Sequence, residues 1–308
     1  MPVTRVGTLT LGDFADRLRG PGVGMRVGPF DVCLRADVRG FDEPLHRLYR
    51  DHPLLGSGRV FSCHVALRDV WQFLPRPQRR VRFSVDGRAP HEDLPAEQAL
   101  AVFEWGLNLV IALRSHCFLM LHSAVLERNG RALALPAAPG SGKTTLCAAL
   151  AQRGWRLLSD EFGLLRPGST NFLPIPRPMP LKNESIDVIR AFEPAVELGP
   201  RIPKTRKGTV AHVRPTTESV ERQNELAPAR WFVFPRWVAG APLSLEEISK
   251  TEGFAQLATN AFNYEMQGAA GFETVRSLVD ASRCFELAYS GLDEAVAALT
   301  ALADDDAG

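Results

Sequence analysis

The stretch LALPAAPGSGKTTLCAAL, residues 133–150, constrains the fold of this 308-residue chain more than any other segment. An apolar run typical of a buried strand gives way to a loop rich in Pro, Gly and Ser, and an Ala- and Leu-rich helix follows it. The helix, predicted at 143–153, ends at Gly154, and a further strand lies in WRLLSDEFGLL. Strand, loop, helix and strand in this order predict a β-α-β unit with a parallel crossover. We therefore expect an α/β fold.

The loop carries most of a phosphate-binding motif, G-x-x-x-x-G-K-[ST]. In this motif backbone N–H groups surround the phosphates, the lysine reaches the outer ones and the hydroxyl ligates Mg²⁺. Ala137 takes the place of the first glycine, which a negative φ at that residue would allow. The residues expected to hold a nucleotide are Ala138, Pro139, Gly140, Ser141, Gly142, Lys143, Thr144 and Thr145.

A β-hairpin is predicted directly before this loop. FLMLHSAVLE and RALALPA are apolar runs joined across Asn129-Gly130, and Asn-Gly between such runs favours a two-residue turn. Such a turn makes residue 128 face residue 131, which places His122 opposite Ala137 at the start of the loop. A lone histidine in an apolar strand is usually a core side chain, but this register favours a role at the nucleotide.

Two acidic residues follow the second strand of the β-α-β unit. Strand 156–159 would run parallel to strand 131–136, so both would end at the edge where α/β sheets bind ligands. Asp160 and Glu161 are therefore expected beside the loop. A carboxylate pair there could ligate Mg²⁺, and one carboxylate could accept the proton of an attacking hydroxyl.

Two basic segments lie downstream, RPMPLKNES (177–185) and PKTRKG (203–208). Basic side chains can neutralise the charge that develops on a phosphoryl group during transfer. The candidates for contact with phosphate or substrate are Lys182, Asn183, Lys204, Arg206 and Lys207. Glu184 is a further candidate metal ligand, and Asn183 is also a candidate cap of the helix predicted in NESIDVIRAF. The alternative is a solvated basic loop.

The chain is expected to have two parts. Residues 1–93 read as short strands with one short helix in DEPLHRLYRDHP, which predicts a smaller α+β region. Residues 94–308 would form the larger domain, opening with a helix at 94–116 that is apolar on most of its circumference and therefore buried. Residues 167–182 are expected to be extended, and residues 194–230 irregular and partly mobile.

Composition excludes several classes of protein. Lys and Arg number 36 against 35 for Asp and Glu, so no net field would recruit nucleic acid or an anionic membrane. The five cysteines are scattered without a C-x-x-C pair, which fits a reducing compartment. The N-terminus does not read as a signal peptide, and the most apolar runs, LNLVIAL and CFLML, are too short to span a bilayer. A cytoplasmic protein is expected.

Taken together, LHSAVLERNGRALALPAAPGSGKTTLCAALAQRGWRLLSDEFGLL resembles the core of the HPr kinase/phosphorylase family. Nearly the whole chain is similar to the subgroup called HprK-related kinase A, through FEWGLNLVIA, LLSDE, PRPMPLKNESIDVIR, KGTVAHVRP and NAFNYEMQGAAGF. The resemblance implies a P-loop core with a mixed sheet, like that of HPr kinase and phosphoenolpyruvate carboxykinase. Ser123 and Glu161 replace the family's glycine and second aspartate.

The resemblance also implies roles for individual residues. Asp160 would be the catalytic base, Lys143 and the loop amides would hold the β- and γ-phosphates of ATP, and His122 falls on the family's histidine. Thr144 and Glu161 would serve Mg²⁺. The family's downstream RGLGI-like signature is missing from the sequence, so phosphorylase activity and HPr as acceptor are not expected. The family's hexamers make a homo-oligomer an expectation.

The leading interpretation is an ATP- and Mg²⁺-dependent kinase acting on a Ser or Thr hydroxyl of a protein or peptide. Residues 1–93 would then recognise the acceptor or a partner protein. Two alternatives stay open: a kinase of a small metabolite, and a nucleotide-binding switch without transfer chemistry, which the departures at Ala137 and Glu161 suggest. The sequence does not distinguish ATP from GTP or pyrophosphate as the donor.

Overall fold

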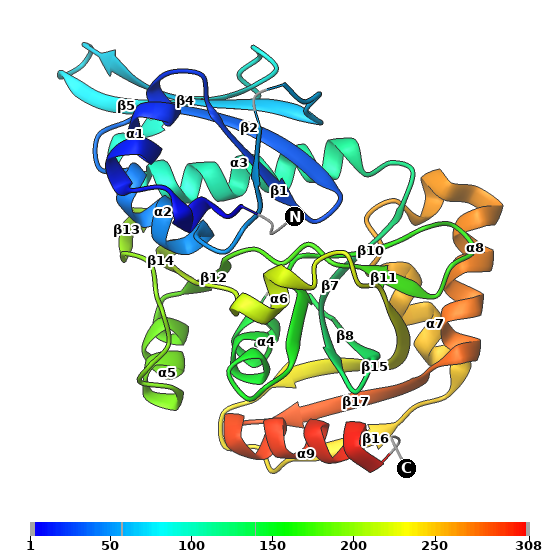
Figure 1. Cartoon of the computed structure of the whole chain (residues 1–308). Helices are drawn as coiled ribbons and strands as arrows, with labels where there is room; N and C mark the ends of the chain where they lie inside the picture. Colours follow the sequence, from blue (N-terminus) through cyan, green and yellow to red (C-terminus); the bar gives the residue numbers. More distant parts are fainter. Residues whose placement is uncertain (1–3, 57, 139, 306–308) are drawn as a thin grey trace.

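The structure is a computed structural model that describes residues 4–56, 58–138 and 140–305. It is a mixed α/β fold, and its two larger sheets each combine parallel and antiparallel pairs. Figure 1 shows the N-terminal region, coloured blue to cyan, on one side of a larger part that contains the remaining sheets. The expectation of an α/β class is confirmed.

The N-terminal region is built on a six-stranded sheet in the order β3-β1-β2-β4-β5-β6. Its strands are β1 (Val23–Val27), β2 (Phe30–Asp37), β3 (Leu54–Leu55), β4 (Cys63–Gln72), β5 (Gln78–Val85) and β6 (Leu94–Pro95). The short helix α2 (Asp42–Tyr49) lies where it was predicted. Helix α1 (Leu11–Arg19) was not predicted; the Thr10 side chain caps it by accepting a hydrogen bond from the Asp13 N–H.

Helix α3 (Ala99–Arg114) packs on this sheet and leads into the larger part. A Cβ on Gly106 would lie 2.2 Å from the Phe83 ring of β5, so only glycine allows this close approach. Among the described residues, one helical segment, Ala96–Arg114, is long and apolar enough to cross a membrane, and most of it is buried inside the fold. The predicted buried helix is confirmed.

The larger part is built on an eight-stranded sheet in which β7 (Leu119–Arg128) is central to the site. β7 and β8 (Arg131–Pro136) form the predicted hairpin, and Asn129 and Gly130 have φ of 54° and 75°, as a two-residue turn requires. Parallel to β8 run β15 (Ala227–Trp237) and, beyond it, β17 (Arg283–Tyr289). The other strands are β9 (Arg156–Ser159), β10 (Phe162–Leu165), β11 (Asn171–Leu173) and β16 (Ser244–Glu247).

Helices cover both faces of this sheet, which explains why β8 is apolar from Ala132 onward. Leu133 and Leu135 share a core with α4 (Lys143–Ala151), α5 (Glu184–Phe192) and α9 (Leu292–Asp305). Ala132 and Ala134 point the other way, into a core with α7 (Lys250–Thr259) and α8 (Tyr264–Ala281). Figure 1 shows α4, α5 and α9 apart from α7 and α8.

The segment WRLLSDEFGLL does not form the single strand that was predicted. β9 and β10 both pair antiparallel with β7, and the chain bends at residues 160–161 between them. β9 therefore runs parallel to β8 as predicted, but β7 lies between the two strands. The bend interrupts the ladder at the position where the two acidic residues occur.

The prediction of an irregular 194–230 segment is wrong. This part of the chain contains β13 (Ile202–Thr205), β14 (Gly208–Val213) and α6 (Thr217–Glu221). β14 pairs with β13 and with β12 (Met179–Lys182). β12 lies within residues 167–182, which were expected to be extended. Pairing with a strand distant in the chain sets this structure, and local propensity does not reveal such pairing.

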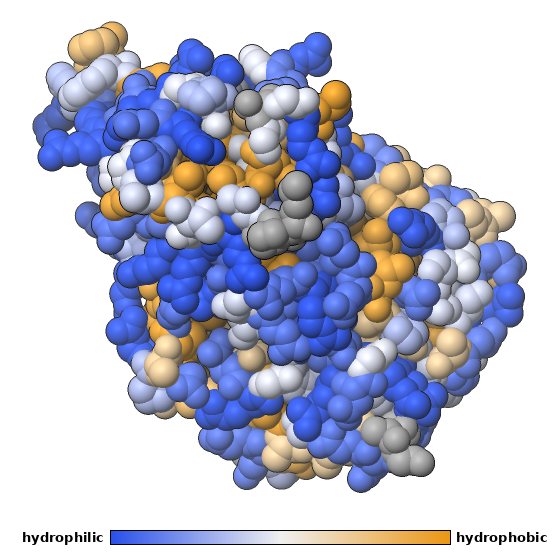
Figure 2. Space-filling model, viewed as in Figure 1, coloured by the Kyte–Doolittle hydropathy of each residue, from blue (hydrophilic) through white to orange (hydrophobic). Residues whose placement is uncertain are grey.

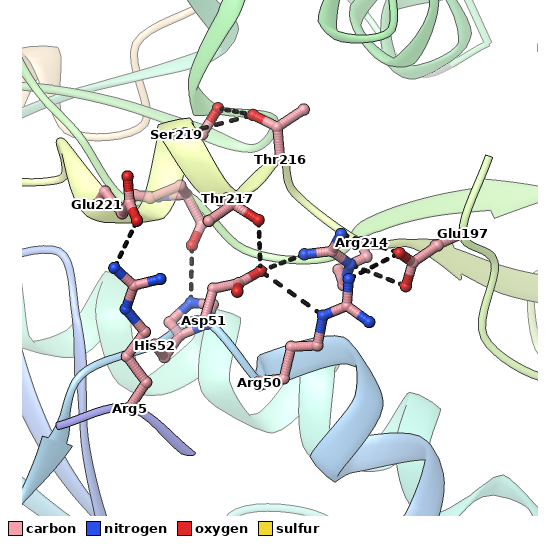
Figure 3. A network of polar contacts seen from close by, with 11 residues as sticks. Arg5, Arg50, Asp51, His52, Glu197, Arg214, Thr216, Thr217, Ser219 and Glu221 are labelled. Atoms are coloured by element: carbon pink, nitrogen blue, oxygen red, sulfur yellow. Dashed lines mark hydrogen bonds and ion pairs between the residues drawn. The ribbon is translucent and has the colours of Figure 1, made fainter. Parts of the chain in front are cut away.

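Polar contacts join the N-terminal region to the larger part (Figure 3). Asp51 accepts hydrogen bonds from Arg214 and, at 3.2 Å, from the Thr217 hydroxyl. Arg214 also donates two hydrogen bonds of 3.0 Å to Glu197, and Arg50 donates one of 2.8 Å to the same carboxylate. These contacts hold the two parts in a fixed relation.

The hairpin of β4 and β5 projects from the N-terminal sheet (Figure 1). Its end exposes three large apolar side chains, Trp71, Phe73 and Leu74. Figure 2 shows apolar atoms at this projecting end of an otherwise largely hydrophilic region.

Candidate functional site

The loop between β8 and α4 has the backbone of a tight, glycine-dependent turn. Gly140 and Gly142 have φ of 91° and 87°, a region that side chains other than glycine rarely enter. At Gly142 a Cβ would in addition lie 2.5 Å from the Tyr289 hydroxyl. Pro139, which was predicted to contact a nucleotide, lies outside the described residues. The loop backbone thus approaches its neighbours closely.

The loop opens onto the N-terminus of α4, which begins at Lys143. The first N–H groups of a helix have no partner within the helix, and no side chain caps this end. These N–H groups and the helix dipole favour an anion at this position. The arrangement is the one that the sequence motif predicts.

Two strands on the side of β8 away from β7, β15 and β17, hold the loop in place. The Trp237 N–H, at the end of β15, donates a hydrogen bond of 3.0 Å to the Ser141 carbonyl. The Tyr289 hydroxyl, at the end of β17, donates one of 3.3 Å to the Gly142 carbonyl. The Ser141 and Gly142 carbonyls therefore have partners within the protein, and the Ser141 N–H donates a hydrogen bond of 3.4 Å to the Ala138 carbonyl. The N–H groups that begin α4 are the donors left for a ligand.

A hollow of about 540 Å³ lies over the loop and the start of α4. Its lining brings together most of the residues predicted from the sequence. These residues are His122, Ala138, Gly140, Ser141, Gly142, Lys143, Thr144, Thr145, Glu161, Lys182 and Lys207, and Pro180 and Ser185 complete the wall. Three lysines and one carboxylate therefore surround the hollow.

Lys143 and Asp160 are buried neighbours at the floor of this site. Burial lowers the pKa of Lys143, and the Asp160 carboxylate opposes that shift. Burial raises the pKa of Asp160 to about 7, against the opposing effect of Lys143. Neither Lys143 Nζ nor either Asp160 carboxylate oxygen makes a hydrogen bond of normal geometry, although the Thr144 hydroxyl is close enough to lower the pKa of Asp160. These buried polar atoms are available to a ligand.

Asp160 and Glu161 share one small cavity, and only Glu161 also lines the large hollow. Glu161 is half-buried and lines the large hollow. Asp160 is only 7% exposed and lines a small cavity of about 20 Å³ beneath it, together with Glu104, Asn108 and Arg177. Glu161 also borders this cavity, so it reaches both spaces, whereas Asp160 lines only the small one.

His122 lies where the hairpin register predicted. Ser123 pairs with Pro136, so the next residues outward are His122 and Ala137. The ring is half-buried at a centroid distance of 5.1 Å from Phe262. Burial, and next the charge of Lys143, lower the pKa of His122, so the imidazole is neutral at pH 7. A neutral imidazole can accept or donate a hydrogen bond to a ligand at the start of the loop.

Lys182 and Lys207 reach the hollow from the small sheet of β12, β13 and β14. Lys182 ends β12, and Lys207 lies in the turn between β13 and β14. The Lys207 ammonium lies 5.7 Å from the centre of the Trp105 ring. Burial, and next the charge of Lys182, lower the pKa of Lys207. The two cations face the same space as Lys143.

The other predicted residues lie elsewhere. Asn183 occupies the N-cap position of α5 as predicted, but its side chain makes no capping hydrogen bond; Oδ1 instead accepts one of 3.0 Å from the Thr209 N–H. Glu184 lines a neighbouring hollow instead of the one around Lys143. The Lys204 carbonyl accepts a hydrogen bond from Gln98, and Arg206 pairs with Glu92, both away from the hollow.

The sequence reading missed a buried polar group beside Asp160. Glu104 lies within α3 and accepts a hydrogen bond of 2.7 Å from the Tyr49 hydroxyl. Arg177 lies 3.6 Å from Glu104 and donates a hydrogen bond to Asn108. Burial raises the pKa of Glu104 to about 7. The available signal was a glutamate within a helix that is otherwise nearly all apolar.

The described residues contain no group of three or more His, Cys, Asp and Glu side chains that could hold a metal ion on its own. The oxygen donors near the loop include the Thr144 hydroxyl and the Asp160 and Glu161 carboxylates. Mg²⁺ needs only one or two such protein ligands when phosphate oxygens and water supply the rest. The residues present fit a Mg²⁺ ion that arrives with a nucleotide.

No model of a protein family matches this chain, and no curated protein is similar to it. A function can therefore be inferred only from the residues of the site and their surroundings.

Proposed function

We propose that the protein is an ATP- and Mg²⁺-dependent kinase of the HPr kinase type, with a P-loop core, that phosphorylates a Ser or Thr hydroxyl of a protein or peptide. One observation carries the proposal. Lys143 and Asp160 are buried charged neighbours without hydrogen-bond partners, next to an uncapped helix N-terminus. Buried charges of this kind are costly, so they are typical of a site built for a charged ligand.

The loop and the start of α4 bind the phosphates of the nucleotide. The backbone N–H groups of the loop donate to the inner phosphates, and Lys143 reaches the outer ones. Mg²⁺, when bound, draws negative charge from the phosphate oxygens. The Thr144 hydroxyl and the Glu161 carboxylate are the oxygen donors placed to hold it.

Asp160 accepts the proton of the acceptor hydroxyl. The hydroxyl oxygen then forms a bond to the γ-phosphorus, the bond from that phosphorus to the β–γ bridging oxygen breaks, and ADP leaves. A carboxyl whose pKa is raised to about 7 can exchange a proton near neutral pH. Lys182 and Lys207 neutralise charge on the transferred group, and His122 contacts it from β7.

A nucleotide-binding switch without transfer chemistry is a second candidate, because Asp160 is only 7% exposed. A hydroxyl can reach its carboxylate only if Glu161 or the neighbouring turns move. A switch would use the same phosphate contacts and would need no base.

The deciding experiment uses labelled ATP with Mg²⁺, an array of Ser- and Thr-containing peptides, and a panel of hydroxyl metabolites. The kinase proposal expects wild-type transfer to a subset of the peptides. Asp160→Asn should lower the rate about 10²- to 10⁴-fold, the range for loss of a general base, and change ATP affinity less than about threefold. Transfer to metabolites alone would replace the peptide acceptor with a small one. ATP binding without transfer to either set would establish the switch.

Two lysine variants serve as a matched pair for the phosphate contacts. Lys143→Ala should abolish detectable ATP binding, whereas Lys204→Ala, away from the hollow, should bind as the wild type does. Equal ATP affinity of the two variants would contradict phosphate binding at this loop.

A further inference from the structure

A second hollow, of about 610 Å³, lies beside the loop on the side of α5, α9 and the end of β17. Its volume is within the range of small-molecule sites, roughly 300–1,000 Å³. The wall is mainly apolar and aromatic and includes Val188 and Phe192 of α5, Trp237 and Tyr289 of the sheet, and Leu292 of α9. Trp237 and Val188 are 50% and 43% exposed, so this wall is accessible to a ligand.

This hollow meets the phosphate site at particular residues. Gly140, Gly142 and Thr145 border both spaces, whereas Lys143 and Thr144 border only the hollow that also contains Glu161. In a P-loop the lysine reaches the outer phosphates and the hydroxyl after it serves Mg²⁺. The inner end of a bound polyphosphate therefore points toward Thr145 and the apolar hollow.

A third hollow, of about 760 Å³, borders the loop at Ala137, Ala138, Gly140 and Ser141. Its wall includes the carboxylates of Glu246 and Glu286 and the polar side chains of Gln256 and Asn260. Two carboxylates also line the hollow at α5, Glu184 and Asp293, so charge does not separate the two spaces. The wall of the third hollow is more polar and offers a base fewer aromatic side chains. The hollow at α5 and α9 is the better match for a nucleoside.

We propose that the hollow between α5, α9 and Trp237 binds the nucleoside of the nucleotide whose phosphates occupy the loop. This inference rests on the proposed function only as far as phosphate binding, and it does not need phosphoryl transfer. The base lies against Trp237 and Phe192, and the Asp293 carboxylate, which also lines the hollow, accepts a hydrogen bond from a base amine or ribose hydroxyl. The ligand is thus a nucleotide and not inorganic polyphosphate.

The test compares Mg²⁺-ATP with Mg²⁺-tripolyphosphate by isothermal titration calorimetry. The wild type should bind ATP at least 10-fold more tightly than tripolyphosphate. Val188→Trp fills the hollow from a partly exposed position on α5, so it should lose that advantage and keep its tripolyphosphate affinity. Unchanged tripolyphosphate binding also verifies that the variant is folded. Ala191→Trp, in the same wall, repeats the test if the first variant does not fold.

Thr259→Trp is the matched control because it places the same side chain in the third hollow. It should leave both affinities unchanged. Equal binding of ATP and tripolyphosphate by the wild type, or full ATP affinity in Val188→Trp, would overturn the nucleoside site while phosphate binding stands. A larger loss in Thr259→Trp would overturn it as well.

The same titrations separate this inference from the function above. If the wild type binds neither ligand, phosphate binding at the loop is refuted, and the nucleoside site with it. If ATP binds in the α5 hollow but no acceptor is phosphorylated, the kinase is refuted and the nucleoside site stands.

Discussion

Two clusters of charged side chains differ in how their charges are compensated. The junction cluster, Arg50, Asp51, Glu197, Arg214 and Thr217, joins the N-terminal region to the larger part, and its charged groups hydrogen-bond or pair with one another (Figure 3). The site cluster, Lys143, Asp160, Glu161, Lys182 and Lys207, sets three cations against two carboxylates. Lys143 Nζ and both Asp160 oxygens have no hydrogen-bond partner.

The difference indicates what each cluster is for. A buried charge costs several kcal/mol unless a partner and hydrogen bonds compensate it. The junction cluster meets that requirement with its own residues, which is typical of a structural contact. The site cluster does not, and its surplus of positive charge would be compensated by a bound anion. Each prediction below tests one side of this contrast.

The largest effect is expected at the junction. Arg214→Met would leave Asp51, whose side chain is 13% exposed, without its main cationic partner. Loss of one member of such a pair costs about 3–5 kcal/mol, so the free energy of unfolding should fall by about that amount in urea titrations. Arg50→Met, at a side chain that is 42% exposed, should cost less than about 1 kcal/mol. A loss below about 1 kcal/mol in Arg214→Met would mean that the junction cluster is not structural.

The next effect depends on pH and concerns Glu104 beside the site. Burial raises its pKa from 4.5 to about 7, so between these values the folded protein holds a proton that the unfolded chain has released. This contribution to stability is present below pH 4.5 and is lost as the pH rises through 7. The Gln side chain of Glu104→Gln does not titrate. Relative to this variant, the free energy of unfolding of the wild type should therefore fall by about 3 kcal/mol between these pH values. Urea titrations from pH 4.5 to 8 would measure this difference, and a constant one would contradict burial of an ionisable Glu104.

An effect opposite in sign to that at the junction is expected at Asp160, the proposed base. Asp160→Asn removes a carboxylate whose pKa is raised to about 7 by burial. At pH 8 this carboxylate is ionised, and its buried charge destabilises the folded protein. By the same conversion the shift from 3.8 to about 7 corresponds to about 4 kcal/mol, so the free energy of unfolding should rise by about that amount at pH 8. Asp51→Asn at the junction should instead lower it. If Asp160→Asn destabilises the protein, the site cluster is compensated after all.

The smallest effect separates neighbouring cations. Lys207 lines the hollow, whereas Arg206 pairs with Glu92 on the surface. Lys207→Ala should reduce phosphoryl transfer roughly 10-fold, the effect of about 1.4 kcal/mol of lost transition-state stabilisation. Arg206→Ala should leave the rate unchanged. Equal rates for these variants in the labelled-ATP assay would remove Lys207 from the site cluster.

The parts of the site that were predictable depend on nearby residues in the chain. The Asn129-Gly130 turn fixes the hairpin register, and that register places His122 beside the loop. The loop glycines and Lys143 follow from a local motif. Because these features are set within about 25 residues of sequence, a single chain is enough to reveal them.

The unpredicted parts depend on pairing between distant segments. β14 forms by pairing with β12, and no feature of residues 194–230 predicts that partner. The cavity at Asp160 is lined by Glu104 of α3, more than 50 residues earlier in the chain, and by Arg177 of the Pro-rich segment that follows. The bend between β9 and β10 was missed because WRLLSDEFGLL has no glycine or proline at the break.

Helix α3 links the N-terminal region to the cavity at Asp160. The helix packs against the N-terminal sheet at Gly106, and it also supplies Glu104 to the cavity at Asp160. Residues 1–93 are therefore not an interchangeable module. A graft of a different N-terminal region onto this protein would have to provide a new hydrophobic cover for α3 and a new hydrogen-bond donor in place of Tyr49.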